Sequence, residues 1–176
     1  YEHLPNTWDE MFDENGTVRE SYSSFHSFFS KISLDELDQM NDFAIQFFKS
    51  QGITFNVYSD EKGVEKIFPF DIIPRIINQE EWRLIEKGII QRIKALNLFL
   101  KDIYHDQFIL KDNLIPPSLI ASNENYLREM RNLPVPSDIY SHISGIDLIR
   151  DEKGKFCVLE DNLRTPSGVS YMLENR

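Results

Sequence analysis

Two carboxylates and one amide in the last third of the chain have the residue types and spacing to hold a cation. Asp147 lies in one apolar segment, and Glu160 and Asn162 close the next one. Mg²⁺ prefers oxygen ligands, and proteins usually bind it through one or two carboxylates, with water and the phosphates of a substrate completing its shell. These three residues are therefore candidate ligands of a nucleotide-bound magnesium ion.

The elements that must position these side chains are the two strands of a β-hairpin over residues 144–162. Its turn is Asp151-Glu-Lys-Gly154, in which Gly154 can adopt the positive φ that such turns need. A symmetric turn there predicts that Arg150 pairs with Lys155 and that Asp147 pairs with Val158.

Side chains alternate along a strand, so this register predicts which residues share a face. Asp147, Glu160 and Asn162 would lie together, whereas Cys157 would lie on the opposite face as a core residue. A slip of one residue would turn Asp147 away from the other two. The alternative is that the three are ordinary polar residues on the wet face of an antiparallel hairpin.

The same residues carry a resemblance to a known family. Asp147, followed after a hairpin by Glu160-x-Asn162 and a Pro-Ser-Gly loop, resembles the signature of ATP-grasp proteins. Most of residues 66–176 resembles, more specifically, the circularly permuted type 2 ATP-grasp proteins, which are bacterial and similar to glutathionylspermidine synthase. The segments that carry this likeness are Pro69–Ile77, Ala95–Asn97, Asp102–Tyr104, Arg128–Arg131, Gly145–Leu148 and Leu159–Arg176.

The resemblance implies that Asp147, Glu160 and Asn162 bind the Mg²⁺ that accompanies ATP. It also implies a ligase that joins a carboxylate to an amine through an acyl-phosphate. In a permuted protein the nucleotide-lid lysines and the adenine-binding segment would follow residue 176. We therefore expect this chain to be an N-terminal portion, truncated at 176 and inactive alone.

Further residues are candidates for binding anions and substrate. Arg164, two residues beyond Asn162, is our candidate catalytic residue, because a guanidinium can grip phosphate or carboxylate bidentately. Ser167 and Gly168 could bind substrate through backbone amides if a helix begins near Val169. The remaining candidates for substrate binding are Arg75, Arg128 and Arg131. The alternative for Arg164 is an ordinary surface arginine, and the alternative for Ser167 and Gly168 is a plain turn. The other three arginines could instead form structural ion pairs.

Composition narrows the class of protein. The formal net charge is −10, which disfavours nucleic acid as a partner. The single cysteine fits a reducing compartment such as bacterial cytosol, and no apolar run approaches the roughly 18–20 residues that cross a bilayer. We expect a cytoplasmic protein whose partners are ATP and a small molecule or peptide, with no nucleic acid and no membrane.

The overall pattern predicts an α+β fold in which antiparallel hairpins pack on helices. Residues 1–30 are expected to form an irregular arm, and residues 31–176 the N-terminal part of a circularly permuted ATP-grasp domain. A capping box of Ser33 and Glu36 starts a helix that Gly52 ends. A hairpin is predicted over 53–68, a long helix over 78–106, and short helical turns over 118–130.

Three functions remain open on the sequence. The first is an ATP-dependent carboxylate–amine ligase. The second is a non-catalytic binding or scaffold module on the same frame, which salt bridges from Lys or Arg to the metal face would favour. The third is a phosphotransferase that uses the same ATP site on a hydroxyl acceptor.

Overall fold

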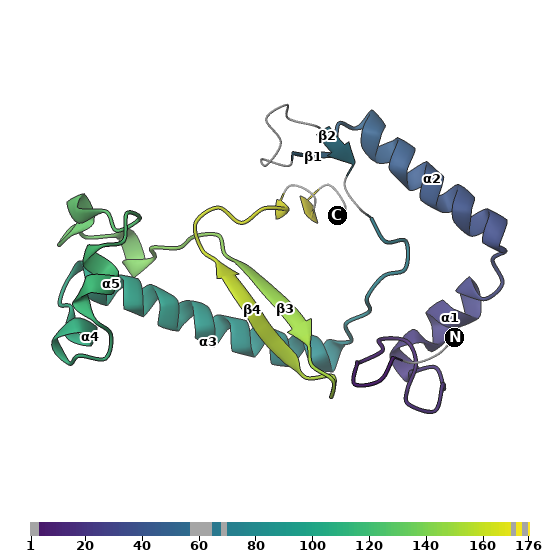
Figure 1. The fold of residues 1–176 in the computed structure, drawn as a ribbon, viewed down its shortest axis with the longest axis horizontal. Coiled ribbons are helices and arrows are strands. Elements are labelled where there is room, and N and C mark those ends of the chain that lie inside the picture. The colour runs from purple at the N-terminus through teal and green to yellow at the C-terminus, as the bar shows by residue number, and fades with distance from the viewer. Residues whose placement is uncertain (1–3, 57–64, 68–69, 170–171, 174–175) are drawn as a thin grey trace. The chain divides into compact units, whose positions relative to one another are not determined.

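The protein has the α+β fold that the sequence predicts (Figure 1). A computed structural model describes residues 4–56, 65–67, 70–169, 172–173 and 176. Among these residues there are two antiparallel sheets of two strands each, β1–β2 and β3–β4. The chain divides into two compact units, Tyr1–Asn78 and Gln79–Arg176.

The first unit begins with an arm that is more ordered than predicted. Its elements are η1 (Glu20–Tyr22), α1 (Ser23–Phe29), α2 (Leu34–Ser50), β1 (Thr54–Asn56) and β2 (Glu65–Ile67). The expectation of an irregular stretch up to residue 30 is wrong for 20–29, because aromatic side chains stabilise helix there. Phe25 and Phe29, one turn apart, stack with ring centroids 4.9 Å apart.

One buried tyrosine connects this arm to the end of the unit. Tyr22 is only 2% exposed. Its hydroxyl donates to the Pro74 carbonyl at 3.2 Å and accepts from the Ile76 amide at 2.8 Å. Residues 74–76 lie outside any helix or strand. The Tyr22 hydroxyl therefore gives the Pro74 carbonyl and the Ile76 amide hydrogen bonds that regular secondary structure would otherwise provide.

Helix α2 begins as predicted, with the Ser33 hydroxyl and the Glu36 carboxylate forming a capping box. Gly52, with φ of +66°, follows its C-terminus. Of the residues on α2, Phe48 is buried, whereas Phe43 is 70% exposed. The predicted hairpin over 53–68 is confirmed by the antiparallel pairing of β1 with β2, and its turn lies outside the described residues.

The second unit is built on one long helix, α3 (Gln79–Tyr104), which confirms the helix predicted over 78–106. Ile85 and Ile103 on this helix are buried, and the intervening residues at spacings of three and four are half-buried. The other elements are α4 (Phe108–Lys111), α5 (Pro117–Ala121), η2 (Arg128–Met130), η3 (Pro136–Asp138), β3 (Gly145–Arg150) and β4 (Phe156–Asn162). The short helical turns predicted over 118–130 correspond to α5 and η2.

Two ion pairs fasten the β3–β4 hairpin along α3 (Figure 1). Arg92 donates to both carboxylate oxygens of Asp161, at 2.6 and 2.5 Å. Arg150 donates to the Glu81 carboxylate at 2.9 Å, and its side chain is only 9% exposed. Both hairpin residues therefore face the helix.

A second set of polar contacts fixes the open end of the hairpin. The Asn97 side-chain oxygen on α3 accepts from the backbone amides of Tyr140 and Ser141, at 2.7 and 3.1 Å. The buried Ser141 hydroxyl donates in turn to the Leu163 carbonyl at 3.0 Å. The chain just before β3 and the chain just after β4 are thus held against one helix.

Candidate metal centre

The structure places the three candidate metal ligands on one face of the hairpin. Asp147 lies directly opposite Glu160, and Asn162 lies opposite Gly145. Opposite residues share a face, and Gly145 and Asp147 share one because they are two apart. The predicted pairing of Asp147 with Val158 is wrong. The predicted placement of Asp147, Glu160 and Asn162 on one face is nevertheless present.

The first cause of the register change is the turn. The Asp151 amide donates to the Lys155 carbonyl at 3.0 Å, and Gly154 adopts φ of +76°. This Asp151–Lys155 pair encloses three residues, 152–154, whereas the predicted Arg150–Lys155 pair would enclose four. Arg150 consequently pairs with Phe156 instead of Lys155.

The second cause is a β-bulge farther along β4. Leu148 pairs with Val158, whereas its neighbour Asp147 pairs with Glu160, so Leu159 is the extra residue between them. The turn shifts the register by one residue, which alone would turn Glu160 away from Asp147. The bulge adds a second shift of one and returns the two carboxylates to the same face.

Between the turn and the bulge, the register stays one residue away from the predicted one, and this changes the face on which Cys157 lies. Cys157 pairs with Ile149 and so shares the face of Asp147, half-exposed. The prediction that Cys157 lies on the opposite, buried face is therefore wrong.

The two faces of the hairpin differ in how their charges are paired. On the α3 side, Asp161 and Arg150 both have ion-pair partners. On the other side, within the described ranges, neither Asp147 nor Glu160 forms an ion pair. The Asn162 amide nitrogen donates to Glu160 at 3.1 Å, which leaves the amide oxygen and three carboxylate oxygens to accept other donors or a cation.

These donors fit Mg²⁺ in chemistry, because all of them are oxygens and two belong to carboxylates. Among the residues that the structure describes, no group of three or more His, Cys, Asp and Glu side chains could hold a metal ion. A hard cation here would thus take an amide oxygen and non-protein ligands besides the two carboxylates.

The loop after β4 folds back over the same face. A Cβ atom built on Gly145 would lie 2.7 Å from the Pro166 Cβ and 3.7 Å from the Asn162 Cβ. Pro166 therefore packs where only a glycine leaves room. Ser167 and Gly168 follow Pro166, and the Gly168 carbonyl accepts from the Met172 amide at 3.1 Å, consistent with a helical turn near Val169.

Arg164 leaves the hairpin in another direction. Its guanidinium donates to the Asn125 side-chain oxygen at 2.9 Å and lines a pocket beside the open end of the hairpin. Arg131 donates to Gln107 at 3.4 Å, and Arg128 lies in η2. Arg75 belongs to the first unit. No ion pair of Arg75, Arg128 or Arg131 occurs within the part of the chain that the structure describes.

Residues 74–176 match the family model described as circularly permuted ATP-grasp type 2. The chain belongs to this family. The segments that resembled the family in sequence thus fall mostly within the second unit, which holds the hairpin and its loop.

The ATP-grasp chain is also similar to bacterial proteins. It is 47% identical to an uncharacterized protein of Synechocystis sp. over 97% of its length and 36% of the relative. It is 46% identical to an uncharacterized protein of Mycobacterium leprae, over 96% of its length and 29% of the relative. A Frankia alni protein named "Putative glutamate--cysteine ligase 2-3" is 36% identical over 99% of the chain and 20% of the relative. The chain thus spans about a third or less of these relatives.

Several residues that shape the hairpin and the loop after it were not singled out by sequence reasoning. Asn97 and Ser141 fix the ends of the hairpin, and Pro166 covers its face. The sequence signal for Asn97 and Pro166 was their place in segments that resembled the family, and Ser141 lies in none of those segments. No described helix is long and apolar enough to cross a membrane.

Proposed function

We propose that this chain supplies the magnesium-binding strands of an ATP-dependent ligase that joins a carboxylate to an amine. One observation carries the proposal. Asp147 and Glu160 face each other across the hairpin, and in the described ranges no lysine or arginine neutralises them.

Like charges directly opposite each other in a sheet destabilise it, whereas opposite charges stabilise it. The hairpin has arginine partners for its acids elsewhere, as Asp161 shows. A pair of carboxylates that lacks such a partner is best explained by a cation that binds between them. The rival hypothesis of a scaffold module predicts salt bridges on this face, so the pairing pattern argues against it.

In this proposal Asp147, Glu160 and Asn162 hold Mg²⁺. The bound ion would neutralise charge on the β- and γ-phosphates of ATP. Arg164 would stabilise the transferred phosphoryl group and the oxyanion through its guanidinium. Ser167 and Gly168 would present a hydroxyl and backbone amides to the substrate, with Arg75, Arg128 and Arg131 as further anion-binding candidates.

The reaction has two steps. A carboxylate oxygen of the first substrate attacks the γ-phosphorus of ATP, the bond from that phosphorus to the β–γ bridging oxygen breaks, and ADP leaves. The amine nitrogen of the second substrate then attacks the acyl carbon, inorganic phosphate leaves, and the amine proton passes to solvent. The products are an amide, ADP and phosphate.

The family and the name of one relative support this chemistry. ATP-grasp proteins generally use ATP with Mg²⁺, and the Frankia alni relative is named "Putative glutamate--cysteine ligase 2-3". Within this proposal residues 31–176 form the N-terminal part of the ATP-grasp domain, in a bacterial cytoplasmic protein that acts on a small molecule or peptide.

The test is calorimetric titration of ATP with Mg²⁺ into the full-length protein that carries this chain. Asp147→Asn and Glu160→Gln should each weaken binding at least about tenfold, because each removes a charged ligand. Glu86→Gln is the matched control, since Glu86 is exposed on α3 and has no role in the site. Unchanged binding in both variants would exclude this face as the metal site.

The kind of reaction is tested separately. Hydroxylamine traps an acyl-phosphate as a hydroxamate, so its formation from substrate and ATP supports the ligase. A stable phosphorylated product would instead show a phosphotransferase.

A further inference from the structure

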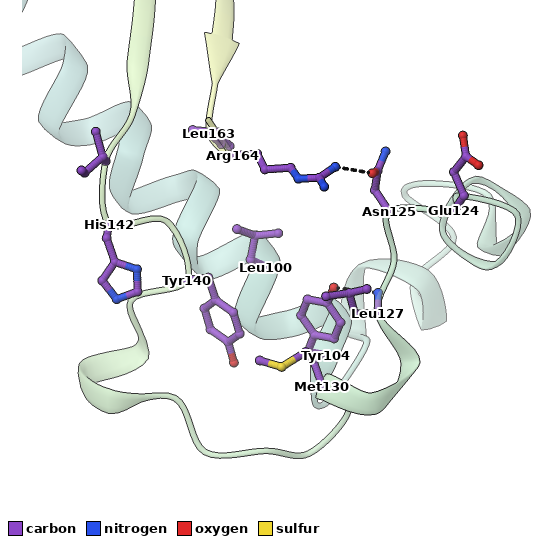
Figure 2. A pocket seen from close by; sticks show the side chains of 11 residues that line it. Leu100, Tyr104, Glu124, Asn125, Leu127, Met130, Tyr140, His142, Leu163 and Arg164 are labelled. Carbon is purple, nitrogen blue, oxygen red and sulfur yellow. Dashed lines mark hydrogen bonds between the residues drawn. The ribbon is translucent and has the colours of Figure 1, made fainter. Parts of the chain in front are cut away.

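A pocket of about 680 Å³ lies beside the open end of the hairpin (Figure 2). That size is in the range of small-molecule sites in proteins. The pocket is formed within the second unit by the end of α3, the segment 124–130, the segment 140–143 and the chain just beyond β4. Its lining includes Tyr104, Glu124, Asn125, Met130, Tyr140 and Arg164.

The aromatic wall of this pocket is held in place by hydrogen bonds. Tyr104 stacks on Tyr140 with ring centroids 5.9 Å apart. The Tyr104 hydroxyl accepts from the Leu127 amide at 3.2 Å, and the Tyr140 hydroxyl hydrogen-bonds His105 at 2.9 Å. Because these contacts fix both rings without a ligand, the pocket is preorganised for an apolar group.

One wall residue is an uncharged phenol. An ordinary tyrosine, with a pKa of about 10, is already neutral at physiological pH. Desolvation raises the pKa of Tyr140 further, with the nearby Asp138 carboxylate adding to the effect, so the ring presents a flat, uncharged surface.

The rim opposite this wall carries the charge. Figure 2 shows Arg164 reaching across to Asn125, with Tyr104, Tyr140 and Met130 on the other side of the space. Asn125 binds one guanidinium nitrogen, so the other donors of this five-donor group can bind a carboxylate. The pocket thus combines an apolar wall with a polar rim that holds the Arg164 guanidinium and the Glu124 carboxylate.

The pocket also lies next to the proposed metal centre. Arg164 is two residues beyond Asn162, so their Cα atoms are at most about 7 Å apart. This short separation places the backbone of Arg164 at the same end of the hairpin as Asn162, and the guanidinium extends from there toward Asn125.

We propose that this pocket binds the acyl donor, and that the donor is an amino acid or short peptide with an apolar or aromatic side chain. Its carboxylate binds Arg164, and its apolar side chain packs against Tyr104, Tyr140 and Met130. This inference rests on the proposed function in one respect, which is that the bound carboxylate is the group that ATP phosphorylates.

Two probes that differ only in charge test the proposal. The dipeptide Leu-Phe and its C-terminal amide are titrated into the full-length protein by calorimetry, both without and with ATP and Mg²⁺. The free acid should bind at least about tenfold more tightly than the amide, because only the acid can accept charge-assisted hydrogen bonds from Arg164. Equal binding of both probes, or no binding of the acid under either condition, overturns the proposal.

Two variants with matched controls assign the site. Arg164→Gln should abolish the preference for acid over amide, whereas Arg83→Gln, at an exposed position of α3, should leave it unchanged. Met130→Trp should fill the pocket and weaken both probes, whereas Leu98→Trp, at a position 66% exposed on α3, should not. A preference for the acid that survives Arg164→Gln contradicts the assignment.

The outcomes separate this inference from the proposed function. Binding of ATP with Mg²⁺ but not of the dipeptide refutes the pocket assignment and leaves the metal centre. Binding of the dipeptide but not of ATP supports the pocket and refutes the ligase.

Discussion

Replacing Gly145 with alanine tests how the loop after β4 is held over the candidate metal face. The new Cβ would lie 2.7 Å from the Pro166 Cβ, whereas carbon atoms in contact prefer about 3.5–4.0 Å. The loop must therefore move by about 1 Å. Overpacking of this kind lowers the free energy of unfolding by about 1–3 kcal/mol. Alanine gives the unfolded chain less entropy than glycine does, which offsets about 0.4–1 kcal/mol of this loss. We expect a net destabilisation of about 1–2 kcal/mol.

Urea denaturation of the full-length protein measures this change, with Gly88→Ala as the control. Gly88 is on α3 and an added Cβ there meets nothing within 4 Å, so this variant should be stabilised by about 0.5–1 kcal/mol. Pro166→Gly itself costs stability because it loosens the unfolded chain, so the double variant is compared with Pro166→Gly alone. In that background Gly145→Ala should no longer destabilise, because the clashing carbon is gone. A Gly145→Ala protein as stable as wild type, or an equal destabilisation in the Pro166→Gly background, would refute the packing argument.

Three further perturbations test contacts that stabilise the two units, each within its own unit. Asn97→Ala removes the acceptor for both backbone amides of residues 140–141, and should cost about 2–3 kcal/mol in urea unfolding. Arg92 holds the pKa of Asp161 below its ordinary value of 3.8, so the pair stabilises the fold above that pH and the benefit is lost on further acidification. The stability difference between wild type and Arg92→Gln, followed from about pH 6 to pH 2, should accordingly shrink at the acidic end. Tyr22→Phe removes a hydroxyl that bonds one carbonyl and one amide. It should lower the free energy of opening of the first unit, measured by hydrogen exchange, by about 1–2 kcal/mol.

Elements with strong local signals were predictable from the sequence. The capping box at Ser33 and the long apolar stripe of α3 depend on neighbours three and four residues away, which the sequence displays directly. The family could also be identified, because the residues around Glu160 and Asn162 form a specific motif.

The hairpin register could not be read so directly. Whether the turn uses three or four residues depends on the φ of Gly154 and on which amide bonds Asp151, and a bulge at Leu159 has no reliable sequence signal. Two errors of one residue cancelled for the metal face but did not cancel for Cys157. The correct grouping of Asp147 with Glu160 was thus reached through an incorrect pairing.

The aromatic pocket shows a different limit. Tyr104 and Tyr140 are 36 positions apart in the sequence, and they stack because Asn97 binds the backbone of the second tyrosine. Contacts over such distances depend on tertiary structure, to which neither periodicity nor local propensity is sensitive.

The bulge at Leu159 restricts how this hairpin can change length in evolution or in protein engineering. Deleting Leu159 alone would leave Leu148 opposite Val158 and Asp147 opposite Glu160, because Leu159 is the extra residue between these two pairs. Deleting Asp161 instead would move Asn162 opposite Ile146 and so carry it to the helix side. A single deletion should therefore be tolerated at the bulge and rejected between Glu160 and Asn162.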